Sequence, residues 1–267
     1  MLNVKPQLSV VVPAYNEADR IETTLSDLIF NDHLLFDRPC EVLIVMDGCT
    51  DGTPQIVEEM IGDNPNAVSL VFPSRLGKGG AIMEALKHTK GDVIAFIDAD
   101  GSIPSAELRR LIKLADEYDL VIGSRYDRNS RLPRERSLKR TLLSRSFNVL
   151  SKLMFWNLNR IGDTQCGVKV FSRRLVDAIK YDFLITGFAF DVNFIYSALS
   201  SGFKVKEVGI TWMEHDGSKL SGAFVKHSFV MAFSLLRLRL YYSRARRVLY
   251  SRRLGWLFAL FYSWSKS

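Results

Sequence analysis

The stretch that decides the fold is residues 93–102, which read VIAFIDADGS. Its first five residues are apolar and predict a short strand that is buried on both faces. Asp98 and Asp100 follow at once, and Gly101 allows the backbone to approach a ligand closely. Two carboxylates on such a loop suit a hard divalent cation that keeps several waters and also binds a ligand's phosphates. A bare D-x-D pair is common by chance, so it is the position after a strand that supports this hypothesis.

Outward from this stretch, strands and helices are predicted to alternate. Runs of β-branched and apolar residues predict strands at 8–13, 42–46, 68–72, 93–97 and 120–123. Apolar spacing predicts helices at 17–30, 53–61, 79–88 and 104–118, and we expect Thr53 to cap the second of them and Pro54 to begin it. A basic, helical stretch at 125–160 precedes strands at 167–171 and 204–207 and helices at 173–179 and 188–200. The alternation predicts an α/β fold, a mostly parallel sheet with helices on both faces.

Polar and acidic residues follow three of the predicted strands. Tyr15-Asn16-Glu17 follows the first strand, residues 47–52 follow the second, and Asp98-Ala99-Asp100 follows the strand at 93–97. Turn chemistry and helix capping explain any one of these clusters about as well as a binding site does. In such sheets, however, ligands bind beyond the carboxyl ends of the strands. Three clusters at one edge therefore predict a common site.

A glycine-rich segment, Arg75 to Ala81 (RLGKGGA), lies at the start of the helix predicted at 79–88. It resembles a phosphate-binding loop but lacks the G-x-x-x-x-G-K-[ST] pattern. Lys78 and three glycines at a helix start are suited to hold an anion. A simple glycine-rich turn explains the segment equally well.

The net charge of +7 is unevenly distributed along the chain. From Gly217 onward there are ten Lys and Arg and no acidic residue, whereas residues 1–216 contain 26 basic and 29 acidic residues. An anionic partner of this C-terminal part is expected, either a membrane surface or a nucleic acid. Segments 224–242 and 246–264 mix Arg with aromatic residues, and their longest uncharged apolar run, 254–264, has eleven residues. That run is too short to span a bilayer and is typical of helices in a membrane interface, although a helix pair packed on the protein's own core is the alternative.

Cysteine usage and the first residues exclude several classes. Cys40, Cys49 and Cys166 form no C-x-x-C pair, which excludes a disulfide framework or a zinc ribbon and favours a reducing compartment. We interpret Cys166 as a small buried residue rather than a nucleophile. The N-terminal residues lack the pattern of a signal peptide. Nothing in the basic C-terminal part resembles a nucleic-acid-reading module, so we expect no nucleic acid as a partner.

Taken together, these segments resemble the GT-A glycosyltransferases of the large inverting family 2. The segments SVVVPAYNE, DGCTDGT, RLGKGGA and FIDADGS occur in the order and at the spacing of that family. Further segments resemble its dolichyl-phosphate β-glucosyltransferase branch, namely GSRY (123–126), DTQCGVKVF (163–171), TGFAFDV (186–192) and WMEHDGSKL (212–220). The resemblance covers about residues 7–220. It implies a GT-A (Rossmann-like) fold and transfer of a hexose from UDP-glucose to dolichyl or polyprenyl phosphate.

The resemblance also implies roles for individual residues on the donor side. The base and ribose of the nucleotide sugar are expected to contact Pro13, Tyr15, Glu17 and Asp47. Asp98 and Asp100 match the pair that binds Mg²⁺ or Mn²⁺ together with the diphosphate. Lys78 stands where the family keeps a basic residue near the nucleotide.

On the acceptor side, the lipid phosphate is expected to contact Arg125, Arg140 and Ser144, which match positions of the related mannosyl enzymes. Other substrate-binding positions in the branch motifs are Asp163, Gln165 and Lys219. Asp191 stands where relatives with a hydroxyl acceptor keep a general base, and contact with a sugar hydroxyl or support of a neighbouring residue is equally compatible with its position. Ser102 and the segment 213–216 depart from the mannosyl pattern, which favours the glucosyl branch.

Residues 1–222 are therefore expected to form the catalytic domain and residues 223–267 basic amphipathic helices that bind the cytoplasmic face of a membrane, as a peripheral or monotopic protein. A phosphate acceptor is ionised near neutral pH and needs no strong general base, whereas a sugar hydroxyl does. The alternatives are a mannosyl enzyme that uses GDP-mannose, a family 2 enzyme with a saccharide-hydroxyl acceptor, and a silent membrane-docked scaffold.

Overall fold

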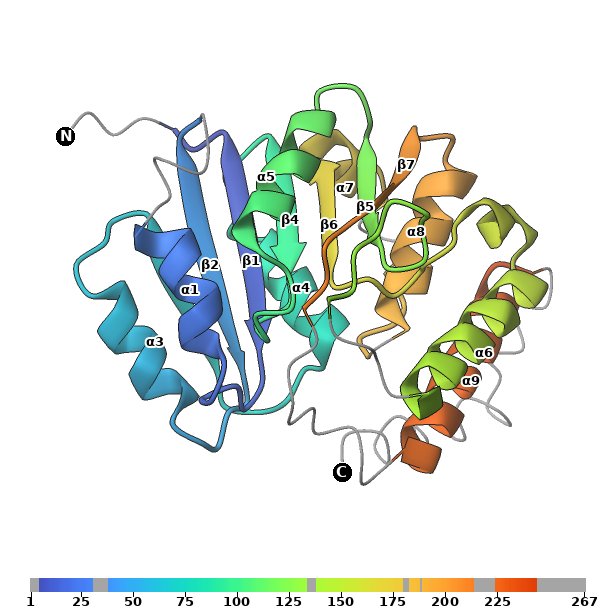
Figure 1. The fold of residues 1–267 in the computed structure, drawn as a ribbon, viewed down its shortest axis with the longest axis horizontal. Helices are drawn as coiled ribbons and strands as arrows, with labels where there is room; N and C mark the ends of the chain where they lie inside the picture. The colour runs from blue at the N-terminus through green and yellow to red at the C-terminus, as the bar shows by residue number, and fades with distance from the viewer. Residues whose placement is uncertain are drawn as a thin grey trace.

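A seven-stranded sheet forms the centre of the protein in a computed structural model that describes residues 5–30, 38–133, 138–179, 183–187, 189–213 and 224–243 (Figure 1). The strands are β1 (Leu8–Ala14), β2 (Cys40–Asp47), β3 (Ala67–Phe72), β4 (Val93–Ile97), β5 (Leu120–Ser124), β6 (Val168–Ser172) and β7 (Val205–Gly209). Their spatial order is β3-β2-β1-β4-β6-β5-β7. All seven predicted strands are confirmed, and each bound lies within two residues of its prediction.

The sheet is mostly parallel, as predicted. β6 is the exception, because it runs antiparallel to both of its neighbours, β4 and β5. The pairs β1–β2, β1–β4, β2–β3 and β5–β7 are parallel. The carboxyl ends of these strands consequently lie at one edge, the lower edge of the sheet in Figure 1.

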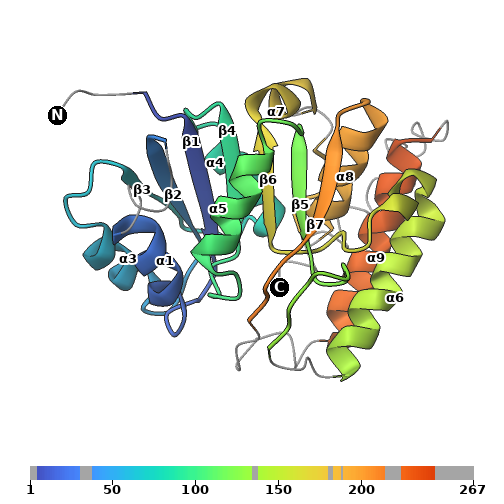
Figure 2. The same ribbon diagram turned by 45° about the horizontal axis from the view of Figure 1, so that its top comes forward.

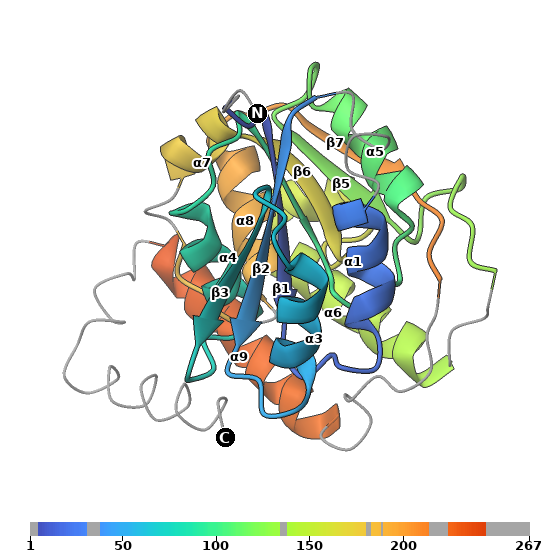
Figure 3. The same cartoon turned by 90° about the vertical axis from the view of Figure 1, so that its left-hand side faces the viewer.

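Helices cover both faces of the sheet (Figures 1 and 3). One face is covered by α1 (Ile21–Phe30), α3 (Thr53–Ile61) and α5 (Ser105–Leu114), and the other by α4 (Lys78–Leu86), α7 (Arg173–Ile179) and α8 (Phe190–Ser200). Strand β1 contributes side chains to both faces of the sheet. Val10 and Val12 pack on the first face, and Val11 packs on the second. All three are fully buried, and each such side chain contributes about 1.5–3 kcal/mol to folding.

A further helix pair lies beside the second layer, at the end of the sheet near β7 (Figure 2). It consists of α6 (Leu138–Met154), which is followed by the 3₁₀ helix η1 (Trp156–Arg160), and α9 (Phe224–Tyr241). Leu235 and Leu238 of α9 are fully buried in the core. The described part of the predicted segment 223–267 thus packs on the rest of the protein, whereas residues 244–267 lie outside the described residues, and the boundary at 222 stays a prediction. Among the described helices, none combines the length and apolarity needed to cross a bilayer.

Two local predictions were wrong. Gly52, not Thr53, occupies the N-cap position of α3. Thr53 is the first helical residue, and its hydroxyl instead donates to Asp51 Oδ1 at 2.5 Å and accepts the backbone N–H of Glu17. The stretch 125–160 is not helical throughout, because residues 125–133 form a loop that pairs with the chain after β7 through Arg131 and Thr211.

Candidate active site

The carboxyl end of β2 holds the glycine-rich loop in place. Asp47, the last residue of β2, is buried, and its carboxylate accepts the backbone N–H groups of Leu76 and of Gly77, the latter at 2.9 Å. Gly77 has φ +85°, and a Cβ there would lie 2.7 Å from the carbonyl oxygen of Thr186, so this position requires glycine. The loop is therefore fixed on two sides, and it places Lys78 as the first residue of α4.

The end of the neighbouring strand β1 carries a flat stacked pair. The guanidinium carbon of Arg75 lies 3.8 Å from the ring centre of Tyr15. Pro13 and Tyr15 are half-buried, and the carboxylate of Glu17 pairs with Arg20. Because β1 and β2 pair in parallel up to Ala14 and Met46, Pro13, Tyr15 and Asp47 lie at the same edge of the sheet.

Asp98 follows β4, and its carboxylate forms an ion pair with the side chain of Lys78. Lys78 Nζ lies 2.7 Å from Asp98 Oδ1, and the two side chains are 14% and 28% exposed. Burial raises the pKa of Asp98, and the charge of Lys78 offsets this only in part. Burial by itself would lower the pKa of Lys78, but the carboxylates of Asp191 and Asp98 raise it well above its ordinary value. The ion pair thus holds Lys78 charged at the edge of the sheet.

The residues around Asp98 fit a divalent cation that takes most of its ligands from elsewhere. Asp100 lies two residues on, and its Oδ1 accepts the N–H of Ser102 at 3.0 Å. A Cβ at Gly167 would lie 2.1 Å from Asp98 Oδ2, so glycine at 167 makes room for this carboxylate. Within the described chain there is no group of three or more His, Cys, Asp or Glu that could hold a metal. Two carboxylates suit Mg²⁺ or Mn²⁺, because these ions keep waters and bind phosphates.

Asp191 joins this cluster from the first turn of α8. It is 2% exposed, its Oδ1 lies 2.5 Å from Lys169 Nζ, and its Oδ2 lies 3.7 Å from Lys78 Nζ. Lys169, the second residue of β6, is fully buried and also donates to the carbonyl oxygen of Cys166 at 2.9 Å. Asp191 is therefore shared by two lysines.

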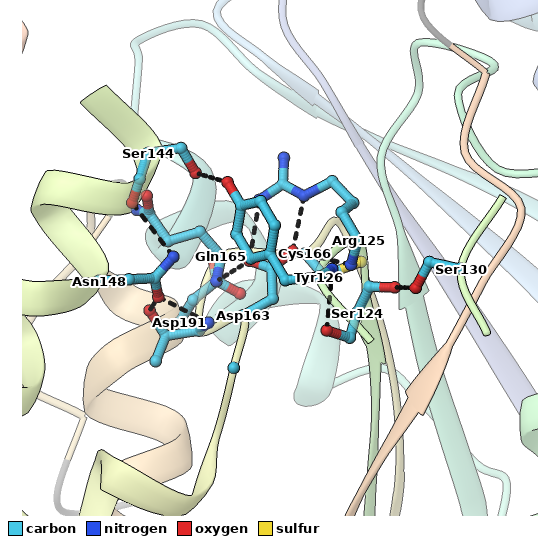
Figure 4. A network of polar contacts seen from close by, with 12 residues as sticks. Ser124, Arg125, Tyr126, Ser130, Ser144, Asn148, Asp163, Gln165, Cys166 and Asp191 are labelled. Atoms are coloured by element: carbon cyan, nitrogen blue, oxygen red, sulfur yellow. Dashed lines mark hydrogen bonds and ion pairs between the residues drawn. The ribbon is translucent and has the colours of Figure 1, made fainter. Parts of the chain in front are cut away.

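A second buried ion pair lies at the end of β5 (Figure 4). Arg125 Nε donates to Asp163 Oδ2 at 2.6 Å and its Nη2 donates to Oδ1 at 2.9 Å. Burial would raise the pKa of Asp163, but Arg125 holds it below its ordinary value. The guanidinium also lies 5.0 Å from the ring of Trp212. Both of these bonds use one side of the guanidinium, so the fixed group keeps further N–H donors that a ligand could use.

The helix α6 is connected to this ion pair by a network of hydrogen bonds (Figure 4). Tyr126 donates its hydroxyl to Ser144 Oγ at 2.8 Å. Asn148, one turn along α6, accepts the N–H and the hydroxyl of Thr164 at 3.0 and 2.7 Å. The N–H of Gln165 in turn donates to Asp163 Oδ1 at 3.1 Å. Ser144 is thus bonded to Tyr126, which follows Arg125 in the chain, and Gln165 is bonded to Asp163, the partner of Arg125.

Comparison with known proteins identifies the family. The sequence model described as glycosyl transferase family 2 matches residues 9–180. The chain belongs to glycosyl transferase family 2. This family 2 chain is 33% identical over 254 residues to a dolichyl-phosphate β-glucosyltransferase of Saccharomyces cerevisiae, covering 88% of this chain and 75% of the yeast protein. It is 31% identical over 229 residues to a protein of the same name from Homo sapiens, covering 80% and 69%. The predicted branch is thereby confirmed.

The family 2 chain is also similar to a longer glycosyltransferase and to an enzyme of known structure. It is 31% identical over 236 residues to glycosyltransferase AglD of Haloferax volcanii, and it spans only 36% of that longer protein. A crystal structure of glucosyl-3-phosphoglycerate synthase from Mycobacterium tuberculosis with Mn²⁺, UDP and glucosyl-3-phosphoglycerate has a TM-score of 0.65 at 19% identity, covering 88% of this chain and 79% of the synthase. The structural likeness confirms the predicted GT-A fold.

The fold brings seven of the fourteen predicted site residues of this glycosyltransferase into two groups. Asp98, Lys78 and Asp191 are joined by ion pairs, and Arg125, Asp163, Gln165 and Ser144 belong to the polar contacts around the second ion pair. The side chain of Arg140 and all of Lys219 lie outside the described residues. Cys166 is fully buried, burial raises the pKa of its thiol to about 12, and its predicted role as a small buried residue is confirmed.

Three residues of the site lie in the quoted motifs but were not predicted individually: Lys169, Gly167 and Arg75. The signal for Lys169 is a lysine inside an otherwise apolar strand, VKVF, because a charge there must find a buried partner. Gly167 and Arg75 lie in the quoted motifs, but which side chains they meet depends on pairing between distant strands.

Proposed function

We propose that this family 2 glycosyltransferase transfers glucose, with inversion, from UDP-glucose to the phosphate of a dolichol or related polyprenol. The relatives named dolichyl-phosphate β-glucosyltransferase match 80–88% of the chain. The observation that carries the choice of acceptor is the bonding of Asp191.

By resemblance, Asp191 stands where relatives with a hydroxyl acceptor keep a general base, yet its carboxylate is engaged. One oxygen lies 2.5 Å from Lys169 and the other 3.7 Å from Lys78. Both oxygens of this carboxylate therefore face lysines of the protein rather than a position for an acceptor hydroxyl. A phosphate monoester is already ionised near neutral pH and attacks without losing a proton. The site thus suits a phosphate acceptor better than a sugar hydroxyl.

Arg125 is the residue that we assign to the acceptor phosphate. Asp163 fixes its guanidinium through two hydrogen bonds, at 2.6 and 2.9 Å. A guanidinium held in one orientation loses little further freedom when it binds, and its bond to a phosphate oxygen is charge-assisted. Ser144 accepts a hydrogen bond from Tyr126, which follows Arg125 in the chain. On the resemblance alone, we assign Arg140 to the same phosphate and Lys219 to substrate binding.

On the donor side, we assign the nucleoside to the end of the sheet formed by β1 and β2. The stacked Arg75–Tyr15 pair gives a flat surface for a nucleobase, and Pro13, Glu17 and Asp47 lie at the same edge. Lys78 presents an ammonium group from the start of α4, where the helix N-terminus also favours an anion such as the diphosphate.

We propose that Asp98 and Asp100 hold Mg²⁺ or Mn²⁺, since the mycobacterial synthase that shares this fold was crystallised with Mn²⁺ together with UDP. A divalent cation held by these two carboxylates would neutralise the charge that develops on the departing diphosphate. Lys78 adds a second positive charge near the same groups. Inversion requires in-line attack, so the acceptor phosphate on Arg125 and the diphosphate lie on opposite sides of the sugar.

We further propose that the enzyme binds the cytoplasmic surface of a membrane, where such an acceptor is located. Helix α6 presents large apolar side chains to solvent at helical spacing: Leu142 (69% exposed), Val149 (56%), Leu153 (78%) and, in η1, Trp156 (83%). Ser144 of the same helix is bonded to Tyr126, the residue after Arg125. An apolar stripe with a tryptophan at its end is suited to the interfacial layer of a bilayer. The predicted role of residues 223–267 in the same binding stays a proposal.

The double variant Leu153→Ser/Trp156→Ser is expected to weaken binding to vesicles of phosphatidylcholine and phosphatidylserine by at least about tenfold, because two large apolar groups no longer enter the interface. Sedimentation with liposomes measures this. The matched control is Val71→Ser, which removes a 62% exposed apolar residue from β3. Equal loss in both variants, or no loss in the double variant, would contradict the role of α6. A chain ending at Ser243 keeps Leu235 and Leu238 and tests residues 244–267 separately.

The reaction itself is tested by a radiolabel transfer assay with Mn²⁺ and a short-chain dolichyl phosphate. UDP-glucose, GDP-mannose and UDP-N-acetylglucosamine are supplied in parallel, and label entering the organic phase is counted. We expect transfer from UDP-glucose alone. Transfer from GDP-mannose would support the proposed acceptor and show that the proposed sugar is wrong. Nucleotide binding without a lipid product from any donor would indicate a hydroxyl acceptor.

A further inference from the structure

Four charged side chains form a continuous row from β6 to the end of β4. Lys169 Nζ lies 2.5 Å from Asp191 Oδ1, Asp191 Oδ2 lies 3.7 Å from Lys78 Nζ, and Lys78 Nζ lies 2.7 Å from Asp98 Oδ1. Cations and carboxylates alternate along the row. Its inner end is fixed, because Lys169 is fully buried and also bonded to the carbonyl oxygen of Cys166. Its outer end is the carboxylate to which the proposed function assigns a divalent cation.

We propose that Lys78 exchanges partners along this row: it holds Asp98 while no metal is bound, and it moves to Asp191 when a divalent cation takes Asp98. Asp191 and Lys169 are then positioning residues, because they act through Lys78. This inference rests on the metal site of the proposed function, and it assigns a role to Lys169 and Asp191 that does not involve proton transfer.

Charge balance is the first reason for the exchange. Without a metal, the charges of two lysines and two carboxylates in the row cancel. Asp98 therefore has no unpaired charge in the free enzyme. A divalent cation at Asp98 competes with an ammonium that is only 2.7 Å away. An ammonium left in this partly buried place without a partner would be strongly destabilising, as any uncompensated buried charge is. A divalent cation therefore binds tightly at Asp98 only if a second carboxylate is available to pair with Lys78.

The geometry of Asp191 is the second reason. Lys169 binds one carboxylate oxygen and leaves the other directed at Lys78, at a separation just beyond a direct hydrogen bond. A shift of about 1 Å at the end of the flexible lysine side chain would close that distance to an ordinary charge-assisted bond. Because Lys169 cannot move away, Asp191 stays in a fixed orientation. The displaced Lys78 then stays beside the metal, where the diphosphate of the donor binds.

The exchange is tested by measuring Mn²⁺ binding to the full-length protein without nucleotide, from the EPR signal of free Mn²⁺. Lys78→Met removes the competing ammonium and is expected to tighten Mn²⁺ binding about tenfold. Asp191→Asn removes the alternative partner and is expected to weaken it about five- to tenfold. In the Lys78→Met background, the same Asp191→Asn change is expected to leave Mn²⁺ binding unchanged, since the ammonium at position 78 that needs a second carboxylate is gone. Lys78→Arg keeps the charge and is expected to keep the sensitivity to Asp191→Asn.

Two results would overturn the exchange. One is unchanged Mn²⁺ affinity in Lys78→Met. The other is an Asp191→Asn effect that persists undiminished in the double variant, which would mean that Asp191 acts on the metal directly. Thermal melting checks that each variant is folded, and if Asp191→Asn does not fold, the Lys78→Met result decides by itself. Asp100→Asn distinguishes failure of the metal site from failure of the exchange. If Asp100→Asn leaves Mn²⁺ binding unchanged, the metal site of the proposed function is wrong. If Asp100→Asn weakens Mn²⁺ binding but Lys78→Met does not change it, only the exchange is refuted.

Discussion

Asp100→Asn is expected to lower glucosyl transfer about a thousandfold at saturating Mn²⁺, because the ion that neutralises the departing diphosphate contributes several kcal/mol to the transition state. Asp100 is a better test than Asp98, since Asp98 also holds Lys78. An asparagine retains an oxygen that can accept the N–H of Ser102, so the turn after β4 is preserved. The transfer assay with UDP-glucose and dolichyl phosphate, run over a series of Mn²⁺ concentrations, measures the effect.

The matched control for this carboxylate is Asp116→Asn. Asp116 has an exposed side chain (64%) and pairs with Arg38 at 3.5 Å, and exposed pairs of this kind contribute little. We expect the control to keep full activity and both variants to keep the melting temperature of the parent. Transfer by Asp100→Asn that equals the parent rate at every Mn²⁺ concentration would refute the assignment of Asp100 as a metal ligand.

Arg125→Met is expected to lower both stability and transfer. The substitution leaves the carboxylate of Asp163, which is fully buried, without its guanidinium, and breaking a buried pair in this way costs about 3–5 kcal/mol. For a domain of this size the melting temperature should fall by roughly 10 °C. Loss of the cation for the acceptor phosphate should lower transfer at least about a hundredfold, mainly through a higher KM for the lipid. Thermal melting and steady-state kinetics measure the two effects.

A second substitution separates these two roles of Arg125. In Arg125→Met/Asp163→Asn no unpaired carboxylate remains, so most of the lost stability should return while transfer stays low. Arg174→Lys is the control, since Arg174 is 75% exposed and the substitution keeps a positive charge beside Asp119. Recovery of activity together with stability in the double variant would show that Arg125 is structural only and that the acceptor phosphate binds elsewhere.

Much of the fold was predictable because the strands carry their signal locally. Residues 42–46 and 93–97 are apolar throughout, a pattern typical of a sheet covered on both faces, and glycines and polar clusters mark where several strands end. Local signals were insufficient at the start of α3, where Thr53 bonds to Asp51 and Glu17 instead of capping the helix. They also gave no indication that residues 125–133 pair with Thr211, because that contact joins segments about eighty residues apart.

The candidate site was predictable as a set of residue types and positions but not as a set of pairs. The sequence itself determines that Asp98 and Asp100 follow an apolar strand, that Lys78 begins a helix after glycines, and that parallel strands bring such positions to one edge. Which carboxylate neutralises which cation depends on strand order, above all on β6 between β4 and β5. That antiparallel strand carries Lys169 to Asp191 and follows directly on Gly167, beside Asp98. Only the tertiary structure decides these pairings, because the energy of a buried charge is set by the few ångströms around it rather than by its neighbours in sequence.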